Sequence, residues 1–269
     1  MTALAFERVS REFVTPEGAP YVAVHDVSLA IPAGAFVALV GPSGCGKSTL
    51  LNIAAGLLPA STGRVLVGEE ALRGLNRRAT YLFQQDALLP WKTVRDNVAL
   101  GLTLAGASRG EANRRADEWV ARVGLRGFAD HYPAHLSGGM RKRVAMAQNW
   151  ILDRQLVLMD EPFSALDVHT RQSMEAELLA LWESGGDRKT VLFVTHDLEE
   201  AIGLADRVVV LSAGPSSRVL ADHPVAIARP RDLLDLRAQP AFVDLYRSIW
   251  SVLKGEVVRS QRSRDGRGS

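Results

Sequence analysis

Residues 41–49 read Gly-Pro-Ser-Gly-Cys-Gly-Lys-Ser-Thr and fit the pattern G-x-x-x-x-G-K-[ST], directly after the apolar run of residues 36–40. Such a run before a glycine-rich loop is typical of a buried strand. The glycines let the backbone turn tightly and aim successive N–H groups at phosphates, while the lysine reaches the β- and γ-phosphates and the serine hydroxyl holds Mg²⁺. The loop therefore predicts a site for a nucleoside triphosphate.

All nine residues of this loop are candidate ligands of the triphosphate: Gly41, Pro42, Ser43, Gly44, Cys45, Gly46, Lys47, Ser48 and Thr49. Cys45 is the only cysteine of the chain, which excludes an internal disulfide and a thiolate metal site built from it alone. Two compatible interpretations of Cys45 stay open. It is a small side chain that fills space, or a thiol whose modification would block nucleotide binding.

The composition is that of an ordinary globular protein, long enough at 269 residues and 47% hydrophobic content to bury a sizeable core. The net charge is only +2, so no global field indicates binding to nucleic acid, and we expect no nucleic-acid partner. No apolar stretch reaches the roughly 18 residues of a membrane span, and the first residues lack a secretory signal pattern. We therefore expect the chain to stay in the cytoplasm.

Short apolar runs alternate with helical patterns, which is typical of an α/β fold with a mainly parallel sheet. Besides residues 36–40, strands are expected at residues 81–83, 156–159, 191–194 and 208–211, and helices at residues 47–55, 171–182 and 198–204. The first 35 residues carry two strand patterns, at residues 4–9 and 27–31, separated by a turn-rich segment. They predict an antiparallel β layer beside the main sheet.

Residues 86–153 break this alternation, and we interpret them as an inserted α-helical subdomain. Its helical patterns lie at residues 94–104, 110–123 and 137–152. The core would then comprise residues 1–85 and 154–222, with a strand pattern at residues 218–221. A short helical extension is expected at residues 223–258, with helices near 231–236 and 241–253, followed by a disordered tail at residues 259–269.

A pair of carboxylates, Asp160 and Glu161, follows the apolar strand pattern of residues 156–159. Placed beside the phosphate loop, Asp160 can hold Mg²⁺ through water, and Glu161 can orient or deprotonate an attacking water. Strands often end in acidic residues, so the pair alone would be weak support. Together with the phosphate loop it indicates hydrolysis of a nucleoside triphosphate.

The segment Leu-Ser-Gly-Gly-Met at residues 136–140 combines a good helix N-cap, Ser137, with two glycines, Gly138 and Gly139. Such glycines let backbone N–H groups approach an anion at the positive end of a helix. The segment lies between the phosphate loop and the acidic pair, and in this order the chain resembles an ATP-binding cassette (ABC) ATPase. The signature of that family usually reads LSGGQ, so Met140 departs from it. The resemblance covers residues 4–255 and implies a P-loop NTPase core.

The resemblance implies roles for further residues. Gln84 would sense Mg²⁺ and the attacking water, Asp167 lies in the segment at the dimer contact, and His196 would contact the γ-phosphate. Phe13 stands where the family often places an aromatic ring on adenine, although Tyr21 could serve instead and Phe13 could belong to the core. The implied cofactors are ATP and Mg²⁺. The implied catalytic residues are Glu161, His196, Gln84 and Lys47, and the implied metal ligands are Ser48, Gln84 and Asp160.

In this family the signature of one subunit covers ATP held by the phosphate loop of another. Ser137, Gly138 and Gly139 are therefore expected to act on the partner's nucleotide. This implies a homodimer that sandwiches two ATP molecules, and a monomer that hydrolyses ATP poorly.

Residues 87–98 and 192–201 closely resemble the corresponding regions of bacterial importers for nitrate, sulfonate, taurine and related organic anions or pyrimidine precursors. That branch implies integral-membrane permease subunits, with Leu89 and Trp91 at the contact, and a periplasmic or extracellular solute-binding protein. It also implies a peripheral position at the cytoplasmic face of the inner (plasma) membrane. A buried structural Trp91 is the alternative. Gln148 and Asn149 replace the Arg-Ala usual in the family, and the sequence gives no functional reason for them.

The main rival is a soluble ABC-type ATPase that acts on nucleic acid or ribosomes, because local basic pairs such as Arg77 and Arg78 exist. Only 53 positions separate Gln84 from Ser137, which leaves no room for the long coiled coils of chromosome-structuring relatives. A P-loop kinase is a weaker rival. A neighbouring gene for a membrane permease would favour transport.

Overall fold

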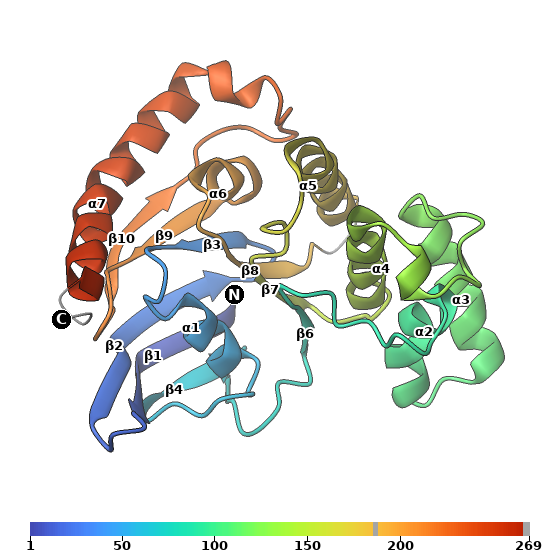
Figure 1. Ribbon diagram of the computed structural model, residues 1–269, viewed down its shortest axis with the longest axis horizontal. Helices are drawn as coiled ribbons and strands as arrows, with labels where there is room; N and C mark the ends of the chain where they lie inside the picture. The colour runs from blue at the N-terminus through green and yellow to red at the C-terminus, as the bar shows by residue number, and fades with distance from the viewer. Residues whose placement is uncertain (185–187, 266–269) are drawn as a thin grey trace.

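The structure is a computed structural model that describes residues 1–184 and 188–265, arranged as two β-sheets with helices around them (Figure 1). The larger sheet has the strand order β10-β9-β3-β8-β7-β6, and the smaller has the order β2-β1-β4-β5. The strands of the larger sheet are β3 (Phe36–Val40), β6 (Ala79–Leu82), β7 (Leu156–Asp160), β8 (Thr190–Val194), β9 (Arg207–Leu211) and β10 (Val219–Pro224). The predicted α/β fold is confirmed.

Five strands of the larger sheet run parallel, and only β10 pairs antiparallel with its neighbour β9. Every residue of β3 and β8 is buried, as expected for strands covered on both faces. Because β3, β8 and β7 are parallel neighbours, the loops that follow them leave from the same edge of the sheet. This edge places the phosphate loop, the acidic pair and His196 together.

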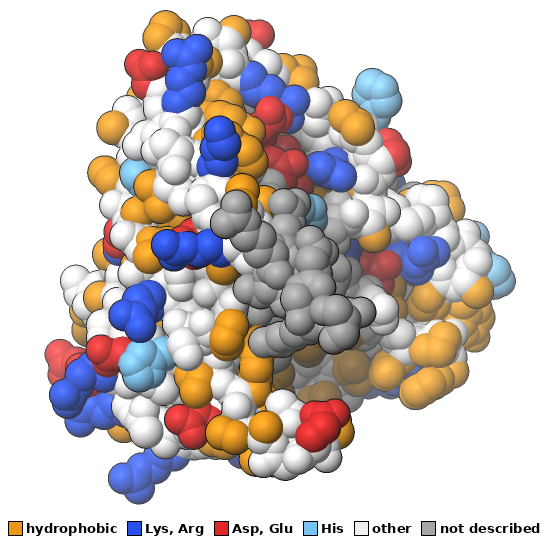
Figure 2. Space-filling model, turned by 60° about the vertical axis from the view of Figure 1, so that its left-hand side comes forward, with side chains coloured by type: hydrophobic (Ala, Val, Ile, Leu, Met, Phe, Trp, Pro, Cys, Tyr) orange, Lys and Arg blue, Asp and Glu red, His pale blue; other side chains and the backbone are white. Residues whose placement is uncertain are grey.

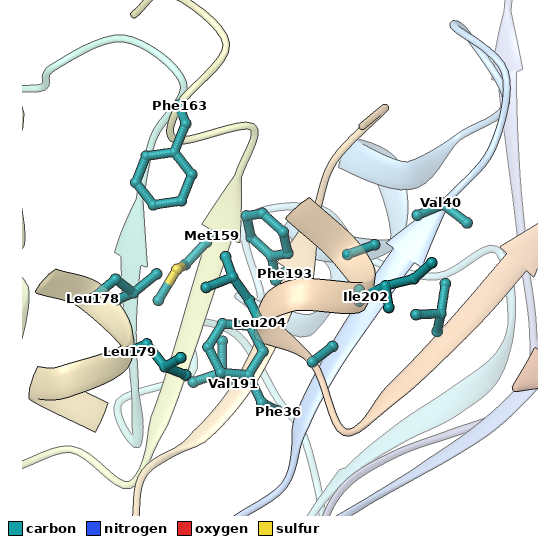
Figure 3. Packing of buried hydrophobic residues seen from close by; sticks show 14 of the residues in the cluster. Phe36, Val40, Met159, Phe163, Leu178, Leu179, Val191, Phe193, Ile202 and Leu204 are labelled. Carbon is teal, nitrogen blue, oxygen red and sulfur yellow. The ribbon is translucent and has the colours of Figure 1, made fainter. Parts of the chain in front are cut away.

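One face of the larger sheet is covered by α5 (Val168–Glu183) and α6 (Leu198–Leu204). Figure 3 shows Phe36 and Phe193 of the sheet packed against Leu204 of α6, with Leu178 of α5 beside Met159. The rings of Phe36 and Phe193 meet edge to face with centroids 5.9 Å apart. This packing fixes α5 and α6 to the sheet and thereby fixes the loops at their starts.

The other face packs on α1 (Lys47–Ala54) and on the smaller sheet. That sheet is formed by β1 (Thr2–Val14), β2 (Pro20–Pro32), β4 (Thr62–Val67) and β5 (Glu70–Ala71). All of its pairings are antiparallel, as predicted for the layer. The sequence prediction of this layer was incomplete, because β4 and β5 also belong to it. Val65 and Val67 are buried, and they alternate with more exposed neighbours.

The helices α2 (Val94–Leu104), α3 (Arg109–Arg122) and α4 (Gly138–Trp150), with the short 3₁₀ turn η1 (Pro133–His135), lie between β6 and β7 in the chain. They form a separate lobe at one side of the sheet (Figure 1). This lobe has its own apolar cluster, centred on fully buried residues such as Val94, Val98 and Val144. The side chains of Thr93, Ser108 and Ser137 cap the three helices.

Two predictions about the C-terminal region are wrong. Residues 231–236 form a turn that leads into the 3₁₀ helix η2 (Leu236–Ala238) rather than a full helix. The reason is that the buried guanidinium of Arg231 donates to the carbonyls at the end of α6, including those of Ile202 and Ala205. The helix α7 (Pro240–Asp265) continues well past residue 259, where disorder was expected. Residues 266–269 lie outside the described residues.

The surface carries both signs of charge. On the face shown in Figure 2, basic and acidic side chains are interspersed with apolar ones. Among residues 1–184 and 188–265, no helix is both long enough and apolar enough to cross a membrane.

Candidate functional site

The phosphate loop connects β3 to α1 beside the smaller sheet. Gly44 and Gly46 have φ angles of 79° and 91°, a left-handed conformation that side chains disfavour. A Cβ on Gly46 would also lie 2.5 Å from the Cγ1 atom of Val24 in β2. Glycine is therefore required at position 46 for both its backbone angle and its close approach to β2.

Lys47 begins α1 and is almost fully buried. Its ammonium donates to the carbonyl oxygens of Gly41, at 2.8 Å, and Pro42, at 3.1 Å. The Lys47 ammonium thus contacts the start of the phosphate loop, and its hydrogen-bond partners there are backbone carbonyls rather than a carboxylate. Such a lysine can turn to a phosphate without breaking an ion pair.

Cys45 is fully buried within the loop, and burial raises the pKa of its thiol. A Cβ on Gly41 would lie 2.7 Å from the Cys45 sulfur, so the sulfur fills the space that the missing side chain leaves. Because the thiolate is the reactive form, this environment favours the space-filling interpretation of Cys45.

Asp160 ends β7 next to the start of α1. The Ser48 hydroxyl donates to Asp160 Oδ1 at 2.9 Å, and the Tyr81 hydroxyl donates to Asp160 Oδ2 at 3.4 Å. Burial raises the pKa of the Asp160 carboxyl, with the neighbouring Glu161 adding to the effect. A hydroxyl and a carboxylate that converge in this way are oxygen donors of the kind that Mg²⁺ prefers. Sequence reasoning missed Tyr81, because its place beside β7 depends on the strand order, which local patterns do not give.

Glu161 follows with a φ of 43°, which is uncommon for a residue with a side chain. Its backbone N–H donates to Val194 O at 2.9 Å, and this bond ties the end of β7 to the end of β8. The carboxylate Oε2 lies 3.1 Å from the Nδ1 atom of His196, which follows β8. The turn therefore directs Glu161 toward His196, in a pair that can orient a water and manage its proton.

Gln84 follows β6, the strand next to β7. Its side-chain amide lies 3.4 Å from the Ser164 hydroxyl, which in turn donates to the carbonyl of Glu161 at 3.0 Å. Gln84 thus lies on the side of the site where Glu161 stands. It connects the beginning of the helical lobe to the segment that follows β7.

Phe13 and Tyr21 are opposite each other in the β1–β2 pair and lie on one face of the smaller sheet. The guanidinium of Arg11 lies 4.7 Å from the centre of the Phe13 ring. The Tyr21 hydroxyl approaches Gly214, and Gly214 packs on the Gly44 carbonyl of the phosphate loop. Both rings are partly exposed and adjacent in the β1–β2 pair, so both stay candidates for stacking on adenine.

The signature residues occupy the N-terminal end of α4 in the helical lobe. The Ser137 hydroxyl accepts a hydrogen bond from the Met140 N–H at 3.3 Å, and Ser137 and Gly138 are exposed. Asp167 similarly caps α5 by accepting from the Thr170 N–H at 3.0 Å. The structure thus brings Ser48, Asp160, Glu161 and His196 together. The signature lies apart from them, at the N-terminal end of α4.

Trp91 is 70% exposed, so the alternative of a buried structural tryptophan is wrong. Its loop is held by the fully buried Asn97, whose side chain accepts from the Leu89 N–H and donates to the carbonyls of Leu89, Lys92 and Thr93. An uncharged groove runs beside this loop between β6 and the helical lobe, and Gln148 lines it together with the exposed Leu104. Asn149 donates to the Ala145 carbonyl within α4.

Comparisons with known proteins agree on the class of this site. A family model described as ABC transporter matches residues 24–164. The taurine import ATP-binding protein TauB of Rhizobium johnstonii is 42% identical over 254 residues, covering 93% of this chain and 96% of that protein. The nitrate import ATP-binding protein NrtC of Synechococcus elongatus is also 42% identical, over 93% of this chain and 38% of its own length.

Solved structures give the same answer. A dimeric ATP-binding cassette in a post-hydrolysis state, bound to ADP and Pi, superposes with a TM-score of 0.72 at 32% identity and covers 84% of this chain and 100% of its own. The chain therefore belongs to the ABC transporter family, is an ATPase, and falls in the branch that includes nitrate and taurine import ATP-binding proteins.

Proposed function

We propose that this chain powers the import of a small solute by hydrolysing ATP beneath a partner permease, with Glu161 and His196 acting on the attacking water and the γ-phosphate. The observation that carries the proposal is the convergence of four side chains from distant parts of the sequence. Ser48 contacts Asp160, and Glu161 contacts His196, all at one edge of the larger sheet. Phosphoryl transfer requires such positioning more than covalent chemistry.

The chemical step is an in-line attack of water on the γ-phosphate, in which the new O–P bond forms as the bond to the β–γ bridging oxygen breaks and ADP leaves. Glu161 accepts a proton from the water, and His196 donates a hydrogen bond to the phosphate oxygens. Lys47 leaves the carbonyls of Gly41 and Pro42 and neutralises the charge on the phosphates, joined by the backbone N–H groups of the loop. Gln84, which is linked to Glu161 through Ser164, would help to orient the water. Phe13 or Tyr21 would stack on adenine.

Mg²⁺ would be held by Ser48 and, through water, by Asp160, with Gln84 at the third position. The short contact between Ser48 and Asp160 supports this assignment because it places two hard oxygen donors side by side. When bound, the cation neutralises charge on the phosphate oxygens.

We place the second half of the site on a second copy of the chain. The exposed Ser137 and Gly138, together with the half-buried Gly139, would cover ATP held by the partner's phosphate loop, and Asp167 would lie at the contact. The dimeric state of two structural neighbours supports this arrangement. Backbone N–H groups at the exposed start of α4 suit an anion.

The transport assignment rests on the relatives that are named as nitrate and taurine import proteins. We infer an organic anion, nitrate or a pyrimidine precursor as the solute, permease subunits that contact Leu89 and Trp91, and a solute-binding protein in the same system. The chain would then work at the cytoplasmic face of the inner membrane. The domain limits of 86–153 for the helical lobe belong to the same proposal.

The test is reconstitution with a candidate membrane permease, sought among the genes that neighbour the gene for this chain. ATP-dependent uptake of labelled nitrate, taurine, an alkanesulfonate and a pyrimidine precursor is measured in vesicles, with a Glu161→Gln chain as the control. Uptake of one of these solutes by the wild type alone supports the proposal. Failure to assemble with the permease, together with co-purification of ribosomes or nucleic acid, would replace it with the alternative of a soluble ABC-type ATPase.

A further inference from the structure

Arg171, in the first turn of α5, contacts two segments that carry expected site residues. One guanidinium nitrogen donates to the carbonyl of Leu166 at 3.2 Å, immediately before Asp167. Another lies 3.4 Å from Asp197 Oδ2, immediately after His196. A single planar group thus spans from the segment expected at the dimer contact to the segment that bears the histidine.

The backbone around His196 is fixed by buried side chains rather than by the histidine itself, whose ring is 57% exposed. The Thr195 hydroxyl donates to Glu200 Oε2 at 2.7 Å and accepts from the Asp197 N–H at 3.0 Å. The Asp197 carboxylate caps α6 with its other oxygen. Because Thr195 and Asp197 flank His196, their positions set where the imidazole points.

Arg171 completes this arrangement, since its Nε atom faces Glu200 at 3.8 Å. A guanidinium offers donors in several fixed directions, whereas a lysine is a single point charge on a flexible chain. Among the side chains that the structure describes around this loop, Arg171 is the one that contacts both Leu166 and Asp197.

We propose that Arg171 is a positioning residue, which couples the Leu166–Asp167 segment to the orientation of His196 by bridging the Leu166 carbonyl, Asp197 and Glu200. The inference rests on the proposed role of His196 in hydrolysis. When the partner chain contacts Asp167, the Leu166 carbonyl shifts, and Arg171 carries the shift to the loop that holds His196. Hydrolysis thereby depends on a completed dimer.

Glu175 makes this bridge sensitive to pH. It lies one turn beyond Arg171 on α5 and is buried, within the electrostatic field of Glu200, Asp197, Arg171 and Arg237. Burial, reinforced by the charge of Glu200, raises the pKa of Glu175 to about 8, and burial raises the pKa of Glu200 to about 7. The charge of Arg237 acts on Glu175 but is shared with Glu199, with which Arg237 forms an ion pair at 3.0 Å. When all these carboxyl groups ionise, they compete for Arg171.

The sign of the effect follows from the raised pKa. The folded chain favours protonated Glu175, so its stabilising contribution is complete below pH 4.5 and is lost as the pH rises through about 8. Because ionised Glu175 adds a negative charge near Arg171, which also contacts Asp197 and Glu200, we expect the bridge to weaken and kcat to fall at alkaline pH.

The first test measures ATP hydrolysis by full-length Arg171→Gln and Arg171→Lys variants. Each is expected to lower kcat about tenfold while the KM for ATP stays within about twofold, because a small misplacement of His196 slows chemistry without touching the phosphate loop. Gln172→Ala, the next residue on the same helix, is the matched control and should keep wild-type kcat. Wild-type kcat in Arg171→Gln, or full rescue by lysine, would overturn the bridge.

The second test is independent of any folding defect in the arginine variants. Glu175→Gln keeps the shape of the side chain and removes its titration. The wild type should lose kcat as the pH rises through about 8, and the variant should keep its kcat over the same range. The exposed Glu12→Gln change serves as the control and should follow the wild type. Superimposable profiles for wild type and Glu175→Gln would contradict the proposal. Full activity in Glu161→Gln would instead contradict the proposed function.

Discussion

The edge of the larger sheet that holds Ser48, Asp160, Glu161 and His196, called the core edge below, and the helical lobe carry the two expected halves of the ATP site. The two halves differ in how far their side chains already contact one another. At the core edge, side chains far apart in sequence contact each other directly, as Ser48 contacts Asp160 and Glu161 contacts His196. At the start of α4, the Ser137 hydroxyl caps its own helix by accepting from the Met140 N–H, while Ser137 and Gly138 are exposed. One chain thus brings the side chains of the core edge into contact by itself, whereas the start of α4 stays exposed, as the proposed contact with a second copy requires.

The largest effect is expected from the core edge. Glu161→Gln removes the proton acceptor but keeps the size of the side chain, so kcat should fall about a thousandfold. ATP binding should persist because Lys47 and the phosphate loop are untouched. Turnover measured by phosphate release, with binding measured by a fluorescent ATP analogue, checks both. Turnover near the wild-type rate would mean that the core edge does not hold the base.

The next effect concerns the exposed half. Gly138→Asp should lower ATP hydrolysis about a hundredfold, since a carboxylate replaces an anion-binding surface. A Cβ at this position meets only Arg141, 3.8 Å away, and an acidic residue suits a helix N-terminus, so the variant should fold normally.

Gly138→Ala is the matched control, because it adds the Cβ without the charge and should lose far less activity. Binding of ATP to the isolated Gly138→Asp chain should match that of the wild type. If the charged variant instead hydrolyses ATP normally, α4 faces no phosphate, and the contrast between the two halves disappears.

Asn97→Ala should produce a moderate effect confined to the helical lobe. It removes a fully buried amide that bonds four backbone groups of residues 89–93, at a cost of about 2–3 kcal/mol in the free energy of unfolding. Urea unfolding measures this cost. The affinity for ATP should stay constant, and a parallel loss of ATP affinity would show that the lobe and the core edge are not separate.

Trp91→Ala should have the smallest effect on the isolated chain, within about 0.5 kcal/mol of stability, because its side chain is mostly exposed. In the assembled transporter it should abolish solute-stimulated hydrolysis. Leu75→Ala is the control, because Leu75 is an exposed apolar residue outside the helical lobe. Normal coupling in the Trp91 variant would remove this loop from the permease contact.

The sequence predicted most of the core edge because its chemistry lies in short local patterns at the ends of apolar strands. Parallel strands then bring those ends together, which is why Ser48 and Asp160 meet across 112 positions. The contribution of Tyr81 depended on knowing which strands are neighbours, and a strand order does not follow from local patterns. The left-handed backbone of Glu161 likewise accompanies its bond to Val194, a contact between strands that local patterns do not contain.

The failures share a physical cause, namely contacts that local patterns do not contain. Residues 231–236 have helical spacing, but the guanidinium of Arg231 donates hydrogen bonds to carbonyls at the end of α6. The last turns of α7 are polar and look disordered by composition, yet they extend a helix already nucleated by its apolar face. The exposure of Trp91 was expected only through the resemblance to importers, because tryptophan by itself is buried more often than exposed.

The four bonds of Asn97 also bear on how tightly a partner can bind. A flexible docking loop must lose about 1–2 kcal/mol of backbone conformational entropy for each residue that a partner immobilises. Residues 89–93 are already ordered around Asn97 in the free subunit. The backbone entropy of this loop is therefore lost when the chain folds and not when a partner binds. A membrane partner that contacts Trp91 would not have to offset that loss.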